Sequence, residues 1–447
     1  MLKASLLDTI NLHAPLKQKL VKNVAGCTWF NQEYVMMRRD RRRAQKKAKK
    51  TGLSVDIDIY KDIRKKTTEL ARSLKRNNIA KKVDGAKGDQ KALYKAFHSL
   101  VDQTNETVLP ECTNDQELAN NFSQFFTEKV RNIRKSSSEI TQCETNVEYE
   151  LFNGTPLSDF VPTTVAELKS LIIEHGIKCS SADDMPADLM LENLDLFLPF
   201  WAELVNASLK NGSMDGLKLA YIKPTLKGND LDHNDLKNYR PVSNLPFLSK
   251  LIERVVLKRL DKHMLENDLH IENQSGYKKG HSTETLLIKI TNDLLIASDK
   301  DTASVLLLLD LSAAFDTVDV NKLLDILFME IGVRGNALTW FKSFLIGRSQ
   351  KVKIRNSYSE EVIIEFGVPQ GSVLGPVLFN IYMRSFYRFV NTNSNFSVQG
   401  FADDHQLYTS FSMGNQVYML GENILSMLLK VKKLDEQLLF EAERTKN

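Results

Sequence analysis

Residues 399–408, QGFADDHQLY, set two adjacent carboxylates, Asp403 and Asp404, at the tip of an alternating run that is typical of a strand. A third carboxylate, Asp310, ends the apolar run of residues 305–309 and precedes Asp403 by 93 residues. Neighbouring acids repel one another, so bringing all three together costs free energy unless a cation offsets the charge. Such a cluster suits two divalent cations, which can hold a triphosphate and activate a hydroxyl for phosphoryl transfer. The pattern therefore indicates nucleotide polymerisation.

Length and composition describe a large chain with a folded core. Its 447 residues can form two or three domains, and its four cysteines show neither paired spacing nor partner histidines. A zinc site or a disulfide framework is therefore not expected, and a reducing compartment fits best. No apolar run approaches the roughly 20 residues that span a bilayer, and the amino-terminal residues lack a signal-peptide core. We expect a soluble or peripherally bound intracellular protein, nuclear or cytoplasmic, with no membrane partner.

Charge is distributed very unevenly along the chain. Residues 1–100 contain 25 Lys and Arg against 9 Asp and Glu, a net charge of +16, whereas the rest carries a net charge of −12. The densest run is 38–50, RRDRRRAQKKAKK, with nine basic residues in thirteen. A run of this kind can be a solvated helix face. Next to a polymerase-like site, it favours binding of a nucleic acid, because contacts to phosphates dominate such affinities.

The predicted elements divide the chain into three regions: a basic helical arm over residues 1–150, a helical lead-in over 151–205, and the globular remainder over 206–447. Within the arm, residues 31–50 and 54–82 form two long helices that break at Thr51-Gly52. Further helices are expected at 117–133, 163–175, 187–211, 247–265, 320–331, 336–345, 374–389 and 417–440. A short strand followed by a polar loop is expected at 221–230, with further strands at 304–310, 350–354 and 361–366 and a hairpin across 396–411. This mixture predicts an α/β (α+β) fold with mixed strand directions.

Two segments between these elements carry the remaining chemistry. Residues 306–319, LLLLDLSAAFDTVD, deliver Asp310 to the end of an apolar strand expected in the centre of a sheet, and Asp316 in the following turn can bond nearby backbone. Residues 366–383, FGVPQGSVLGPVLFNIYM, form a loop punctuated by glycine and proline, followed by an apolar helix. In that loop, Gly371 allows close approach of the backbone, and the amide of Gln370 can bond a base or a sugar edge.

These segments, in this order and spacing, resemble motifs A, B and C of the reverse transcriptases of non-LTR retrotransposons of the LINE type, such as the Jockey and CR1 groups. Residues 239–256, YRPVSNLPFLSKLIERVV, and 274–287, QSGYKKGHSTETLL, resemble the fingers motifs of the same enzymes. The resemblance covers roughly residues 150–447. It implies a right-hand polymerase fold with fingers and palm, preceded by the basic arm. It also implies RNA-directed DNA polymerase activity with an RNA template, a DNA primer, deoxynucleoside triphosphates and two Mg²⁺ ions.

The resemblance also assigns roles to individual residues. Asp310, Asp403 and Asp404 match the metal-binding carboxylates, and the carbonyl of Leu311 falls where the family supplies an extra metal ligand. Phe315 matches the bulky residue that excludes a 2′-hydroxyl, and Gln370 with Gly371 matches the loop beside the nucleotide. The residues in the positions of triphosphate or substrate contacts are Arg240, Lys278 and Arg444.

Two departures from the family lead us to expect a chain truncated at both ends. It opens in linker-like sequence, without the endonuclease that usually precedes the linker. Residues 438–447, LLFEAERTKN, resemble a fourth motif, with Glu441 in place of Asn and Arg444 in place of Lys, after which the thumb is missing. Truncation can impair the enzyme, so a remnant that only binds nucleic acid is the alternative. An RNA-dependent RNA polymerase is disfavoured by the bulky Phe315. The sequence identifies no protein partner.

A second Ala-Asp-Asp triplet, at residues 182–184, lies in the polar segment CSSADDMPADLM. It precedes a predicted helix, where Ser and Asp side chains are favoured as caps. We therefore expect a structural role for it.

Overall fold

A computed structural model gives the arrangement of the chain in two compact units, residues 1–107 and 108–447. The structure describes residues 31–85, 109–112, 114–138, 149–177, 183, 185–228, 230–309, 311–393, 395–412 and 441–442.

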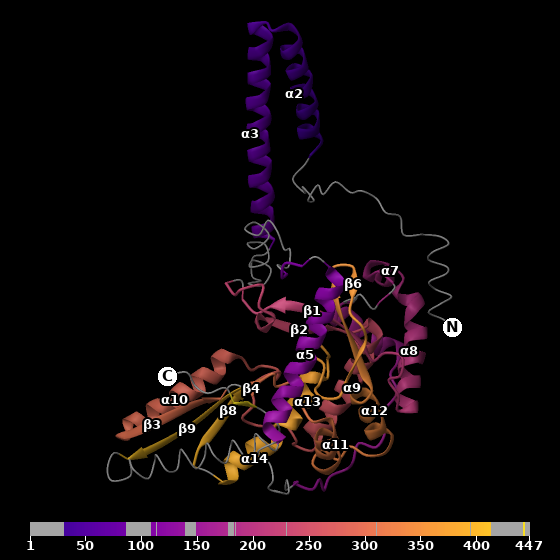
Figure 1. The fold of residues 1–447 in the computed structure, drawn as a ribbon, viewed down its shortest axis with the longest axis vertical. Coiled ribbons are helices and arrows are strands. Elements are labelled where there is room, and N and C mark those ends of the chain that lie inside the picture. Colours follow the sequence, from indigo (N-terminus) through magenta and orange to yellow (C-terminus); the bar gives the residue numbers. More distant parts are fainter. Residues whose placement is uncertain are drawn as a thin grey trace. The chain divides into compact units, whose positions relative to one another are not determined.

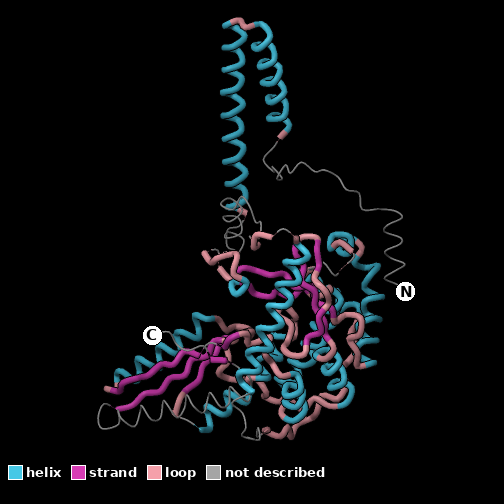
Figure 2. Tube along the Cα trace, viewed as in Figure 1, coloured by secondary structure: helices cyan, strands magenta, loops and turns pink. Residues whose placement is uncertain are grey.

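A helical hairpin forms the described part of the first unit: α2 (Gln32–Thr51) and α3 (Ser54–Asp84) (Figures 1 and 2). Gly52 ends α2 with φ of 66°, a left-handed conformation that glycine adopts at little cost. The carboxylate of Asp56 is buried beside this turn and accepts a hydrogen bond of 2.7 Å from Thr51 Oγ1. Both long helices and the break between them are confirmed.

Two larger sheets and one short strand pair organise the second unit. Their strands are β1 (Leu219–Leu226), β2 (Tyr239–Asn244), β3 (Thr302–Leu309), β4 (Leu311–Ser312), β5 (Arg348–Ile354), β6 (Ser357–Tyr358), β7 (Val362–Ile364), β8 (Ser397–Phe401), β9 (Asp404–Ser412) and β10 (Glu441–Ala442). One sheet has the order β2-β1-β5-β6 with β7 also on β5, and only its β1–β5 pair is parallel. The other sheet, β3-β9-β8, and the pair β4–β10 are antiparallel. The mixed strand directions agree with the predicted α/β pattern.

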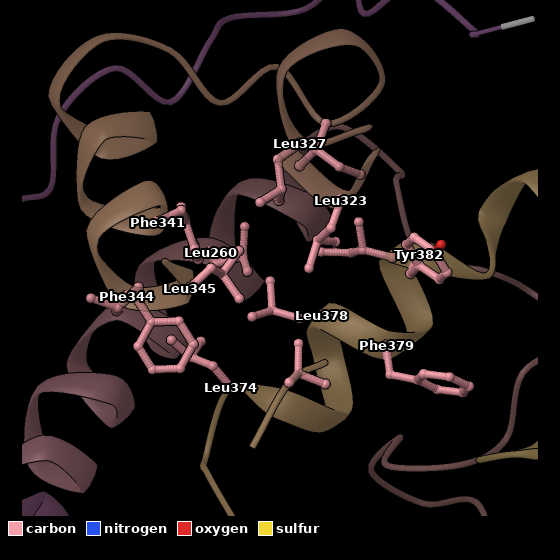
Figure 3. Close-up of a cluster of buried hydrophobic side chains, with 14 of the residues drawn as sticks. Leu260, Leu323, Leu327, Phe341, Phe344, Leu345, Leu374, Leu378, Phe379 and Tyr382 are labelled. Carbon is pink, nitrogen blue, oxygen red and sulfur yellow. The ribbon is translucent and has the colours of Figure 1, made fainter. Parts of the chain in front are cut away.

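Helices pack around these sheets and around one another. They are α5 (Asp115–Ser138), α6 (Val165–His175), α7 (Ala187–Glu192), α8 (Leu194–Asn211), η1 (Leu236–Asn238), α9 (Phe247–Glu266), α10 (Thr283–Asp299), α11 (Val320–Met329), α12 (Gly335–Leu345), α13 (Gly375–Tyr382) and α14 (Arg384–Asn393). Leu260, Leu323, Phe344 and Leu378, one from each of α9, α11, α12 and α13, are fully buried in a common core (Figure 3). This apolar core carries the loops that hold the candidate site.

Three expectations from the sequence need correction. The helix predicted over 374–389 is two helices, α13 and α14, which meet at Met383, where the N–H of Phe386 bonds the carbonyl of Met383 at 3.0 Å in a tighter turn. The helix predicted over 187–211 breaks at Asn193, whose side-chain amide donates to the carbonyl of Leu189 at 3.0 Å. The predicted helix 417–440 lies outside the described residues.

The third correction concerns the apolar run before Asp310. It forms β3 as predicted, but β3 is the edge strand of the described β3-β9-β8 sheet, and β9 is the central strand. Alternate side chains point away from the core, so Leu306 and Leu308 are 42% and 60% exposed. An all-apolar run does not report this alternation, because both of its faces look alike in sequence. Among the described strands, the prediction that this run lies in the centre of its sheet is therefore wrong.

Candidate active site

Asp403 and Asp404 lie at the tight turn between β8 and β9. Phe401 pairs with Asp404, so only Ala402 and Asp403 connect the strands. Ala402 has φ of 58°, a backbone conformation that residues other than glycine rarely adopt but that two-residue hairpin turns require. Asp403 is half-buried and Asp404 is exposed. The hairpin therefore presents two adjacent carboxylates at its tip.

The end of β3 lies beside this hairpin. Leu309 pairs with His405, the neighbour of Asp404, and Leu311 in β4 pairs with Ala442 of β10. Asp310, which follows Leu309, is outside the described residues, as is Arg444. Without Asp310, the described part of the chain contains no group of three His, Cys, Asp or Glu side chains placed to hold a metal ion.

A buried glutamine clamps the carboxylate turn. Gln274 is 2% exposed; its Nε2 donates to the carbonyl of Ala402 and its Oε1 accepts from the N–H of Ala402, each at 3.0 Å. The same Oε1 accepts from the N–H of Gly276 at 2.7 Å. A side chain on Gly276 would place its Cβ 2.2 Å from the nitrogen of Ala402, so only glycine fits there. Sequence reasoning gave Gln274 no role, although it opens one of the fingers-like segments.

Phe315 packs against two aromatic rings, and one of them, Tyr277, lies close to the turn that carries Asp403. Its ring stacks on Phe379 with centroids 4.8 Å apart and meets Tyr277 edge-on at 6.5 Å. Tyr277 has φ of 61° and is 54% exposed, and burial together with the negative charge of Asp403 raises the pKa of its hydroxyl. A strained, exposed aromatic residue beside a carboxylate suggests a surface kept for a ligand.

The loop that contains Gln370 and Gly371 is fixed on two sides. Gly371 has φ of 112°, and a Cβ there would lie 2.5 Å from the carbonyl of Ser243 in β2. The N–H of Ser243 donates to the carbonyl of Gln370 at 2.9 Å, and Gln370 Nε2 donates to Asp316 Oδ2 at 2.8 Å. The carboxylate of Asp316 thus bonds a side chain from the neighbouring loop and not the turn backbone, which corrects the expectation for Asp316.

Two cavities adjoin these loops. One, of about 100 Å³, is lined by Asp316, Gln370 and the buried Arg348. The other, of about 760 Å³, is lined by Tyr277 and Lys278 among other residues. Arg240 lies on the exposed face of β2 and lines neither cavity. The structure therefore does not bring Arg240 and Lys278 into one pocket.

A buried carboxylate that sequence reasoning missed supports the same loop from α9. Glu253 is fully buried, and its Oε2 accepts from the N–H groups of Val373 at 2.6 Å and Leu374 at 3.2 Å. Burial raises the pKa of Glu253, while the charge of Arg348 acts in the opposite direction. The only sequence signal was an acid on the apolar face of a helix.

The second Ala-Asp-Asp triplet contributes a helix cap. The carboxylate of Asp183 accepts from the N–H of Phe247, the first residue of α9, with distances of 2.9 and 3.1 Å to its two oxygens. An acid at a helix amino terminus satisfies a free N–H group and suits the helix dipole. Asp183 therefore has a structural role, and the helix that it caps, α9, begins 64 positions later in the sequence.

Comparison with known proteins gives a consistent family. Residues 226–433 match the family model described as reverse transcriptase (RNA-dependent DNA polymerase). The chain is 29% identical over 308 residues to a probable RNA-directed DNA polymerase from transposon BS of Drosophila melanogaster, covering 65% of this chain and 32% of the relative. It is 30% identical over 277 residues to the RNA-directed DNA polymerase from mobile element jockey of the same species, covering 59% and 28%. The chain thus spans about a third of the length of these relatives.

More distant similarity extends to another type of element. A Pol polyprotein from type-1 retrotransposable element R2 of Popillia japonica is 27% identical over 162 residues, covering 36% of this chain and 22% of the relative.

None of the helices in the described residues is long and apolar enough to cross a membrane.

Proposed function

Because residues 226–433 form a reverse transcriptase domain related to those of non-LTR retrotransposons of the Jockey type, we propose that this chain is an RNA-directed DNA polymerase. It would add deoxynucleotides to a DNA primer on an RNA template. The observation that supports this most is the hairpin tip with Asp403 and Asp404 beside the end of β3. In the hand-shaped description of polymerases, the β3-β9-β8 sheet would belong to the palm and β1–β2 to the fingers.

A reverse transcriptase domain requires a divalent metal, and the residues present fit that requirement. Asp403 and Asp404 offer hard carboxylate oxygens at an accessible turn, which suit Mg²⁺. With Asp310 and the carbonyl of Leu311, they would hold two ions. Bound there, the ions would neutralise the triphosphate and favour ionisation of the primer hydroxyl.

The remaining candidate residues would position the nucleotide. Phe315, fixed by stacking on Phe379, would fill the space that a 2′-hydroxyl needs. Gln370 and Gly371 would lie against the nucleotide, and the cations Arg240, Lys278 and Arg444 would contact phosphates. Since Lys makes no bidentate contact with a phosphate, Lys278 would bind more weakly than an Arg in its place.

The alternative is a protein that binds nucleic acid without polymerising nucleotides. The α2–α3 hairpin supports it, because the run 38–50 has nine basic residues in thirteen and most of these side chains are exposed. In the polymerase proposal, the same hairpin would bind the template or the primer as an accessory.

Primer extension on one RNA template, with deoxynucleotides or ribonucleotides, separates these functions. We expect Mg²⁺-dependent extension with deoxynucleotides, lost in Asp403→Asn without loss of folding, because removing a charge from a repelling pair does not destabilise the metal-free fold. Asp183→Asn, in the second Ala-Asp-Asp triplet, is the matched control; it should extend normally and be less stable. Full activity in Asp403→Asn would overturn the assignment, and binding without extension by the wild type would favour the alternative.

A further inference from the structure

The pair formed by Asp316 and Gln370 joins two loops that the proposed function places around the nucleotide. Asp316 lies in the turn between β4 and α11, and Gln370 lies in the loop before α13. Two backbone hydrogen bonds of 2.8 Å hold the loops together on either side of Asp316, from Val368 N to Phe315 O and from Gly367 N to Val318 O. The carboxylate of Asp316 therefore meets the amide of Gln370 from a fixed position.

The two loops can approach each other closely because residue 367 is a glycine and carries no side chain. Gly367 has φ of 89°, and a Cβ there would lie 2.7 to 2.9 Å from backbone atoms of Asp316. The peptide of Ser243 holds the backbone of Gln370 from the opposite side. With the backbone of both partners restrained, the orientation of the Gln370 amide is the main remaining freedom.

The chemistry of the pair decides that orientation. An ionised carboxylate can only accept hydrogen bonds, whereas a glutamine amide donates through Nε2 and accepts through Oε1. The 2.8 Å contact is therefore Gln370 Nε2 donating to Asp316 Oδ2, and Oε1 points away from Asp316. No side chain or N–H among the described residues donates to this Oε1. The pair thus leaves one acceptor with a set direction.

We infer that Asp316 is a positioning residue that makes Gln370 a hydrogen-bond acceptor toward the incoming nucleotide. This inference rests on the proposed function. The site would then favour a nucleotide that offers a donor at this point. Two groups on a deoxynucleotide can supply one: the 3′-hydroxyl of the sugar and an exocyclic amino group of the base. Both share the same chemistry, and analogues that lack one or the other tell them apart.

The protonation state of Asp316 gives a second way to test the orientation of the Gln370 amide, because pH changes it without a substitution. Burial raises the pKa of Asp316 to about 7, although the charge of Lys129 and the bond from Gln370 act to lower it. As pH falls through this value the carboxyl group gains a proton and can itself donate to Oε1, so the amide turns and offers Nε2 to the nucleotide. The other charged or titratable groups lining the same cavity are Lys129, Arg131, Tyr239, Arg348 and Glu365.

The test is a set of incorporation ratios, measured as kcat/KM on one RNA template. One ratio compares a deoxynucleotide with its 3′-deoxy analogue; the other compares dGTP with dITP, which lacks the exocyclic amino group. At pH 8 the wild type should prefer the donor-bearing nucleotide about fivefold in one of the two ratios, as one hydrogen bond allows. In Asp316→Asn and in Gln370→Leu the affected ratio should fall about fivefold; for dGTP over dITP, what remains is the preference that pairing with the template imposes. Because each ratio uses the same enzyme at the same pH, effects of pH on chemistry cancel.

The wild type alone gives a second readout. Its preference should decline between pH 8 and pH 6, whereas the ratio in Asp316→Asn should stay flat. This measurement decides the matter if Asp316→Asn does not fold. Glu253→Gln is the matched control, since Glu253 holds the same loop by its backbone without contacting the Gln370 amide; it should lower the melting temperature and leave the ratio unchanged.

Each other outcome has a defined meaning. A wild type that extends primers without preference in either ratio overturns the inference and leaves the proposed function intact. So do ratios that keep their wild-type size in Asp316→Asn, or that do not change with pH in the wild type. A wild type that extends no primer refutes the proposed function, and the inference fails with it.

Discussion

Replacing Gln274 by leucine should both destabilise the fold and slow nucleotide addition. Leucine keeps much of the side-chain volume but removes the amide that bonds the N–H and the carbonyl of Ala402. It also removes the acceptor for the N–H of Gly276 at 2.7 Å and the donor to the hydroxyl of Tyr387 at 3.2 Å. Four polar groups thus lose a partner where water has little access, because Gln274, Ala402 and Tyr387 are 2%, 8% and 3% exposed.

The expected loss of stability follows from these contacts. An unsatisfied buried donor or acceptor costs about 1–3 kcal/mol, and neighbouring losses are not additive because the loop relaxes around them. We therefore expect a decrease of roughly 3–5 kcal/mol in the free energy of unfolding. Since native domains have only about 5–15 kcal/mol in total, this is large but compatible with folding.

The functional effect follows from the backbone of Ala402. Gln274 holds Ala402 at φ of 58°, and this conformation aims the carboxylate of Asp403. Without the clamp the turn can relax, so kcat should fall about tenfold or more, as small misplacements of reacting groups do. The KM for the nucleotide should change less, because Gln370 and Phe315 lie on other loops.

Urea unfolding and steady-state primer extension measure the two effects. Gln399→Leu is the matched control, because Gln399 is a 4% exposed glutamine of the same hairpin whose amide makes a longer contact, 3.4 Å to Asn273. Gln399 also hydrogen-bonds the hydroxyl of Tyr408, but neither of its contacts reaches the turn at Ala402. Gln399→Leu should therefore cost about 1–2 kcal/mol and leave kcat unchanged. Equal losses for Gln274→Leu and Gln399→Leu, or an unchanged kcat in Gln274→Leu, would refute the clamp.

Three further outcomes are expected. Phe315→Ala should admit ribonucleotides by opening the space beside the sugar; an unchanged ratio of deoxynucleotide to ribonucleotide use would contradict this role. Deleting residues 1–82 should weaken RNA and DNA binding and reduce the dependence of that affinity on salt concentration. An unchanged salt dependence would mean that the basic side chains of the hairpin face solvent and do not bind nucleic acid. Arg259 lowers the pKa of Glu167 to about 2 from 4.5, so Glu167 should contribute on the order of 2 kcal/mol above pH 4.5. Urea unfolding should show this advantage over Glu167→Gln disappearing as pH falls toward 2.

The sequence predicted what depends on short-range patterns. The hairpin across 396–411 was predicted from an alternating run with a turn, and β8 and β9 occupy it. The break at Gly52 was predicted because a glycine after a helix marks its end. The family and its motifs were recognised because whole segments matched, and the comparisons confirm that resemblance.

What the sequence did not predict depends on contacts between distant residues. Gln274 and Ala402 are 128 positions apart, and nothing in either segment shows that an amide would meet that turn. Likewise, β1 pairs with β5 across more than a hundred residues, so neither strand indicates its neighbour. The edge position of β3 was missed for the same reason, because sheet order is set by the partners of β9.

Support for the site also comes from outside the region that matches the family. Residues 226–433 match, yet α5 at Asp115–Ser138 bonds the turn after β4: Arg134 donates to Asp319 Oδ2 at 2.9 Å and to the carbonyl of Thr317 at 3.0 Å. The guanidinium of Arg134 also lies 3.6 Å from the ring centre of Phe366, at the start of the Gln370 loop.

These contacts are shielded from water, since the side chains of Arg134 and Asp319 are only 14% and 17% exposed. A charge pair that is mostly buried becomes costly when one partner is removed, because the other is left without compensation. A second residue of α5, Lys129, acts on the ionisation of Asp316 from the same helix. The two loops that position the nucleotide in our proposal are therefore held by a helix that precedes the matched region by almost ninety residues. It follows that a fragment limited to residues 226–433 would expose Asp319 and Phe366 and lose the environment that sets the charge of Asp316, even with every motif residue present.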